Sequence, residues 1–137
     1  MRFFYVKTNT LKKIKLPIGE LKLFPDYMEI NFTEGTHIDE EVLFQLVSEK
    51  IKYYKENPIP VVILRKSSAD KYSINPTLFV EHKEFFEAHA KWVAVVASDD
   101  SGFENLEYLK QLTNVPGYGF TNYHKVLELL KKENKLL

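Results

Sequence analysis

The sequence predicts one α/β domain with a mixed sheet, and three observations support that prediction. Between Tyr27 and Leu130, a short strand-like run followed by an amphipathic helix occurs four times. The 137 residues are enough for one well-packed core and too few for a second domain. Two runs, Pro60–Leu64 and Lys91–Ala97, are almost continuously apolar, as expected of parallel strands that are covered on both faces. We therefore expect about four or five strands and about four helices, with an N-terminal hairpin or edge strand.

Residues 1–19 differ from the rest and are expected to form an N-terminal extension or an edge strand before the domain at 20–137. Lysines alternate there with apolar residues at Ile14, Leu16 and Ile18, and Pro17 restricts the segment to a sheet edge. Lysines on an edge strand prevent aggregation, but the same residues could form a basic arm for phosphate or lipid headgroups.

A hairpin is expected next, because Leu21–Leu23 and Met28–Phe32 each place apolar residues on one side of a strand. The turn between them contains Pro25-Asp26, which suits a type I turn. The first helix begins after Gly35, where Thr36 or Asp39 can cap it, and it stops before Asn57-Pro58. Its apolar stripe consists of Leu43, Leu46, Val47, Ile51 and Tyr54.

The later elements follow the same logic of caps and apolar spacing. Asn75-Pro76 starts a second helix that is expected to run to about Ala90. Ser98–Asp100 caps a third helix, and Asn122 caps the last one. Gly117–Gly119, between those two helices, is expected to be a turn, because its glycine spacing does not link a strand to a helix.

The composition excludes several functional classes. Lys plus Arg and Asp plus Glu each total 19, so the net charge is zero and no global field attracts nucleic acid or an anionic membrane. Without cysteine, disulfides, thiolate nucleophiles and Cys-ligated zinc are impossible. The run from Met1 to Val6 is too short for a secretory signal or a membrane span. We expect a cytoplasmic protein with no nucleic-acid partner and no membrane insertion.

Four segments resemble the SpoIIAA-like branch of the STAS superfamily: Tyr27–Phe32, Ile38–Glu41, Trp92–Val96 and Gly119–Leu130. The resemblance is one of pattern and covers roughly residues 20 to 132. It implies a superhelix of strand–helix units around a mixed sheet, and a cytoplasmic location. It also implies a role in partner switching or, in related folds, the binding of apolar ligands.

Anti-sigma-factor antagonists of this superfamily carry an acidic residue and then a phosphorylatable serine after the strand that corresponds to Val61–Leu64. The equivalent loop here offers Ser68 as the first candidate, with Ser67 and Ser73 behind it. It is longer and more basic than the family pattern, and Asp70 follows the first two serines instead of preceding them. A phosphate near a helix N-terminus would meet free N–H groups, but loop and capping roles explain the same serines.

The same loop, Arg65–Ile74, is the expected docking surface for a protein partner. Arg65, Lys66 and Lys71 would neutralise part of a phosphate's charge, and Tyr72 adds an aromatic contact. An exposed edge strand and a net charge of zero also make a homodimer plausible.

Aromatic residues suggest an alternative, since Phe79, Phe86, Trp92 and Phe120 could line an apolar pocket or simply fill the core. His82 and His89 are seven residues apart, about 10 Å along a helix, which is too far for one tetrahedral metal ion. No nucleophile and base occur at a recognisable spacing. We therefore expect a non-enzymatic regulatory or protein-binding module without metal or cofactor, the alternative being a carrier for an acyl or isoprenoid-like molecule.

Overall fold

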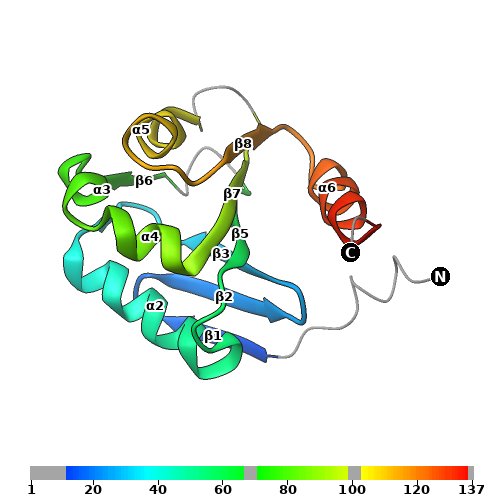
Figure 1. Cartoon of the computed structure of the whole chain (residues 1–137). Coiled ribbons are helices and arrows are strands. Elements are labelled where there is room, and N and C mark those ends of the chain that lie inside the picture. The colour runs from blue at the N-terminus through cyan, green and yellow to red at the C-terminus, as the bar shows by residue number, and fades with distance from the viewer. Residues whose placement is uncertain (1–11, 67–70, 99–102, 136–137) are drawn as a thin grey trace.

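The structure, a computed structural model, describes residues 12–66, 71–98 and 103–135 (Figure 1). Within these ranges, a six-stranded mixed sheet has the strand order β1-β2-β3-β5-β7-β8, and five helices pack against it. This confirms the α/β class and the mixed sheet. The sheet has more strands than the four or five expected, because both the N-terminal edge strand and the glycine-containing segment near residue 118 belong to it.

The sheet has an antiparallel half and a parallel half. The strands β1 (Lys12–Leu16), β2 (Gly19–Phe24) and β3 (Tyr27–Phe32) form an antiparallel meander, which confirms the predicted hairpin. The strands β5 (Ile59–Leu64), β7 (Ala90–Val96) and β8 (Gly117–Phe120) follow parallel to β3. Because each crossover steps in the same direction along the sheet, the helices that connect these strands gather on one face.

Four helices cover that face: α2 (Glu40–Tyr54), α3 (Thr77–Glu81), α4 (Lys83–His89) and α5 (Glu104–Leu112). The last helix, α6 (His124–Lys135), lies across the sheet from them (Figure 1). The side chains of strand β7 alternate between the two faces of the sheet and so contribute to the core on each face. Val93 and Val95 pack beneath α5, whereas Trp92, Ala94 and Val96 pack against residues of α6.

Side-chain hydrogen bonds hold the start of α6 on the sheet. The Tyr123 hydroxyl donates to Glu29 Oε1 over 2.6 Å and lies 2.8 Å from the Tyr27 hydroxyl. Glu29 and Tyr27 are 6% and 1% exposed, respectively. Burial raises the pKa of Tyr27 to about 12 and raises that of Tyr123 still further, so both hydroxyls keep their protons.

The prediction of a second helix was wrong in one respect, because the segment from Asn75 to Ala90 does not form one continuous helix. His82 leaves the α conformation, with φ −119° and ψ 30°, and separates α3 from α4. Its Nε2 lies 2.8 Å from Glu40 Oε2 on the neighbouring helix α2. Neither proline nor glycine marks this position, so the apolar spacing alone suggested one helix.

Two short strands also escaped the sequence analysis. Strand β4 (Thr36–Ile38) pairs in parallel with β6 (Tyr72–Ile74) and forms a separate two-stranded sheet. Thr36 therefore belongs to a strand, and Asp39 caps α2 by accepting a hydrogen bond from the Val42 N–H over 2.9 Å. The Asn122 cap is confirmed by a bond from the Lys125 N–H. The prediction of a Ser98–Asp100 cap was wrong for α5, because that helix begins at Glu104 with Phe103 at its N-cap and no side-chain cap bond; Asp99 and Asp100 lie outside the described residues.

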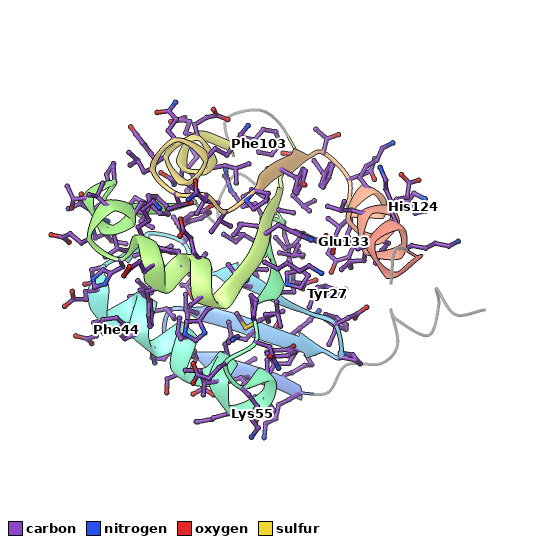
Figure 2. All side chains as sticks on the ribbon, viewed as in Figure 1. Tyr27, Phe44, Lys55, Phe103, His124 and Glu133 are labelled. Carbon is purple, nitrogen blue, oxygen red and sulfur yellow. The ribbon has the colours of Figure 1, made fainter. Side chains whose placement is uncertain are left out.

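Gly117–Gly119, expected as a turn, forms most of β8. A Cβ at Gly117 would lie 3.0 Å from Leu106 Cδ1, and one at Gly119 would lie 3.0 Å from the Phe103 ring. Phe103 lies between α5 and β8 in Figure 2. The glycines are therefore needed for the close approach of a helix to an edge strand and not for a turn.

Candidate functional site

An apolar cavity of about 130 Å³ lies between the sheet and the helices of the four-helix face. Eighteen of its 22 lining residues have wholly apolar side chains, and the exceptions are Lys50, Tyr72, His89 and Asn105. The cavity occurs where two apolar clusters meet, since Val61 packs against both of them. Strands β3, β5 and β7 form its floor, helices α2, α4 and α5 form its walls, and β4 and β6 lie at one end.

One end of the cavity carries a buried lysine and a buried histidine. Lys50, on the last turns of α2, is 2% exposed, and its Nζ donates a hydrogen bond to the Lys55 carbonyl over 2.8 Å. The same Nζ lies 3.0 Å from His89 Nδ1 at the end of α4. Because β5 and β7 begin after these helices, this pair lies at the amino ends of the parallel strands.

The backbone at Lys55 has an unusual conformation. Among the described residues it is the non-glycine residue with positive φ, at φ 61° and ψ −142°, just past the end of α2 (Figure 2). Such a conformation strains an L-residue by about 1–3 kcal/mol. Its carbonyl is the group that accepts the hydrogen bond from Lys50, so the strain occurs beside the polar end of the cavity.

Burial sets the electrostatics of this pair. Burial lowers the pKa of Lys50, and the Glu56 carboxylate opposes that effect. Burial also lowers the pKa of His89, and the nearby Lys50 charge lowers it further. Both shifts disfavour a positive charge at this place. No carboxylate in the described ranges lies within ion-pair distance of Lys50.

Tyr72 and Asn105 line the opposite end of the cavity, at the carboxyl ends of the strands. The Tyr72 ring packs on Phe32 with centroids 4.9 Å apart, and the Asn105 amide donates to the Tyr72 carbonyl over 3.4 Å. Burial raises the pKa of Tyr72 to about 12, although the Arg65 charge opposes the shift. The surface that the cavity exposes is almost wholly apolar, so its four polar side chains line it with their carbon atoms while their polar atoms face elsewhere.

The aromatic residues expected to form an apolar pocket fall into two groups. Phe79 and Phe86 line the cavity, with ring centroids 5.0 Å apart. Trp92 and Phe120 do not line it, because they belong to the cluster on the face that α6 covers. Trp92 directly precedes Val93 and has the opposite phase in the strand alternation, which puts it on the other side of the sheet.

The residues of the predicted switch and docking loop are not brought together around one site. Ser67 and Ser68 lie outside the described residues. Ser73 is in strand β6, not at a helix N-terminus, and its Oγ lies 2.8 Å from His37 Nδ1. Lys66 and Lys71 are exposed and Arg65 is half-buried, whereas Tyr72 lines the cavity. The docking role of this loop stays a prediction, as do a protein partner, a homodimer and a cytoplasmic location.

Sequence reasoning missed Lys50, although the sequence contains a signal for it. Lys50 falls in step with Leu43, Leu46 and Tyr54, at spacings of three and four residues, so it occupies the buried stripe of α2. A lysine at such a position is expected to have a hydrogen-bonding or ionic partner, because charged residues are almost never fully buried alone. From the sequence, His89 was weighed with His82 as a metal ligand, and that role was rejected because the two residues are too far apart along a helix. The real neighbour of His89, Lys50, is 39 residues away in the sequence.

Comparisons with protein-family models, with curated proteins and with solved structures found no match. The described part of the chain contains no group of three or more side chains that could hold a metal ion. No helix in that part combines the length and the apolar composition that a bilayer span requires. The candidate site therefore rests on its own geometry.

Proposed function

We propose that this protein binds a small, largely apolar ligand in the cavity beneath α2, α4 and α5. The observation that carries the proposal is an apolar void of about 130 Å³ in the main core. At about 24 cal/mol per Å³, a fully enclosed void of this volume would cost about 3 kcal/mol. That is a large part of a typical net stability of about 5–15 kcal/mol, and protein cores are otherwise packed with few such voids.

The volume restricts the ligand. An engineered apolar cavity of roughly 150 Å³ binds benzene, so about six carbon atoms suit a cavity of this size. A complete isoprenoid or long acyl chain is too large, and only one end of it would fit. The carrier alternative raised by the sequence is thereby narrowed to short acyl or ring-sized molecules.

We also propose that the architecture is SpoIIAA-like. The successive strands β3, β5, β7 and β8 step in one direction across the sheet, and a helix follows each of them, as the resemblance implies. A regulatory role in partner switching stays a prediction from that resemblance. The cavity gives ligand binding a concrete physical basis, so we rank ligand binding first.

Benzene titration tests the ligand-binding proposal directly. At ten times its Kd, benzene should stabilise the wild-type protein by about 1.4 kcal/mol, seen as a rise in Tm. Val61→Phe, which adds a ring at the junction of the two core clusters, should fill the cavity and remove the response. Val80→Phe is the matched control, because Val80 on α3 is 60% exposed and does not line the cavity.

Two further results bear on whether the cavity binds a ligand. Native mass spectrometry of the purified protein should reveal a co-purifying apolar mass that Val61→Phe lacks. If benzene leaves the Tm and the methyl NMR signals of the cavity residues unchanged at saturation of the solvent, ligand binding at this site is refuted.

A further inference from the structure

We propose that two copies of this chain associate through strand β8, each copy pairing its β8 with that of the other in antiparallel orientation. In the described ranges the six-stranded sheet ends at β1 on one side and at β8 on the other. Strand β8 lies between α5 and α6 in Figure 1. No residue of β8 lines the cavity, so this inference is independent of the ligand-binding proposal.

The free edge of β8 presents the backbone groups of its two glycines. N–H groups in and just after β7 donate to the carbonyls of Pro116 and Phe120, both over 3.0 Å. In a parallel pair of strands every second residue bonds to the neighbour, so Pro116, Tyr118 and Phe120 face β7. The N–H and C=O groups of Gly117 and Gly119 therefore point to the free edge, where no group in the described ranges pairs with them.

The two edges of the sheet differ in their protection against pairing. On β1, Lys12, Lys13 and Lys15 are exposed, and Pro17 follows the strand. Lysine and proline are the residues that commonly prevent a further strand from adding to an edge. Strand β8 carries no charge and no proline over Gly117–Phe120. Of these two edges, β8 is therefore the one that can accept another strand.

A second β8 fits this edge because the edge is complementary to itself. With a two-fold axis at Tyr118, Gly117 of each copy lies opposite Gly119 of the partner subunit. Each such pair exchanges two hydrogen bonds, so the two pairs use all the free N–H and C=O groups of both glycines. A two-fold dimer requires a surface of this kind, in which the same patch is contributed by both copies.

The side chains of β8 support the same register. Strand alternation puts Pro116, Tyr118 and Phe120 on the face that α6 covers, where the Tyr118 ring lies 5.9 Å from that of Trp92 and 6.1 Å from that of Phe120. Tyr118 is still 36% exposed. In the dimer it meets its own counterpart at a position without hydrogen bonds, where opposite side chains are closest and aromatic pairs are favourable.

Sedimentation over a range of protein concentrations tests the inference. The mass of the wild-type protein should rise with concentration from that of one chain toward that of two. Tyr118→Lys puts like charges directly opposite each other and should raise the dimer dissociation constant by at least about tenfold. Tyr53→Lys, on α2 and equally exposed at 36%, is the matched control and should dimerise as the wild type does.

A mixing experiment separates lost pairing from lost folding. Tyr118→Glu should also be monomeric alone, whereas an equimolar mixture of Tyr118→Lys and Tyr118→Glu should dimerise, because opposite charges then face each other. A mixture that stays monomeric would contradict pairing at this position.

Cross-linking tests the register directly, because the natural chain has no cysteine. Opposite residues without hydrogen bonds have Cα atoms about 4.5 Å apart, which is within the range of a disulfide. Tyr118→Cys should therefore form a disulfide-linked dimer under mild oxidation, and Tyr53→Cys should not. The inference is overturned if Tyr118→Cys stays unlinked or if Tyr118→Lys dimerises like the wild type. It is also overturned if the wild-type protein stays monomeric up to its solubility limit, which would leave the edge to a strand from a different protein.

Discussion

Replacing Tyr123 by phenylalanine should destabilise the protein by about 3 kcal/mol, although only one oxygen atom is removed. The hydroxyl donates to Glu29 over 2.6 Å and lies 2.8 Å from the Tyr27 hydroxyl. Loss of a hydrogen bond to a charged group costs about 1.5–3 kcal/mol, and a buried hydroxyl left without its partner costs about 1 kcal/mol more. Glu29 and Tyr27 are too deeply buried for water to replace the missing oxygen easily.

Urea unfolding followed by the fluorescence of Trp92 measures this change, because Trp92 lies in the same cluster as Tyr27 and the residues of α6. For a chain of 137 residues, about 3 kcal/mol corresponds to a fall in Tm of roughly 10 °C. Tyr118→Phe is the control, since Tyr118 is 36% exposed on β8 and its loss of a hydroxyl should cost less than about 0.5 kcal/mol.

A double-mutant cycle with Glu29→Gln distinguishes the hydrogen bond from a packing effect. If the bond carries the stability, the two substitutions should be non-additive by about 1.5 kcal/mol or more. Additive effects, or a cost for Tyr123→Phe below about 1 kcal/mol, would show that α6 is held by apolar contacts alone.

Two further predictions concern the polar end of the cavity. Lys55→Gly should raise the free energy of unfolding by about 1 kcal/mol, because glycine adopts φ 61° without strain and the carbonyl that binds Lys50 is retained. The control Lys52→Gly, within α2, should lower the free energy of unfolding by a similar amount. A loss of stability in both variants would contradict the strain argument. The free energy of unfolding should also fall as the pH drops below about 6.5. Burial and Lys50 lower the pKa of His89 in the folded state, so the unfolded chain binds the proton first. Glu56 raises that pKa, but its effect is smaller. The stability contribution of the neutral imidazole is thus present above the unfolded pKa and is lost as the pH falls through the folded one. His89→Gln should flatten this part of a pH series of urea titrations, and an unchanged slope would exclude His89 as its source.

The regular part of the fold was predictable because its signals are periodic. The buried runs at β5 and β7 and the apolar stripe of α2 repeat over enough residues to identify strand or helix. The break at His82 and the strands β4 and β6 were not predictable in this way. A three-residue strand has no periodicity to detect, and neither proline nor glycine marks the break at His82.

The candidate site was less predictable than the fold, for a physical reason. A cavity is a deficit of side-chain volume between elements, and no local pattern records it. Phe79 and Phe86 could be suggested from their apolar character, but the same character suggested Trp92, which the strand alternation places on the other face. Lys50 is the exception, since a charged residue inside the apolar stripe of a helix is recognisable from residue spacing alone.

The glycines of β8 have a consequence for the range of ligands. They allow α5 to lie directly on the edge strand, and Leu106 and Leu109 of that helix form part of the cavity wall. A side chain at Gly117 would crowd Lys110 and Leu106 on α5, so a strand that does not line the cavity constrains the position of its Leu106 wall. Substitution at position 117 could therefore change the width of the cavity in a related chain, although no cavity-lining residue would be altered.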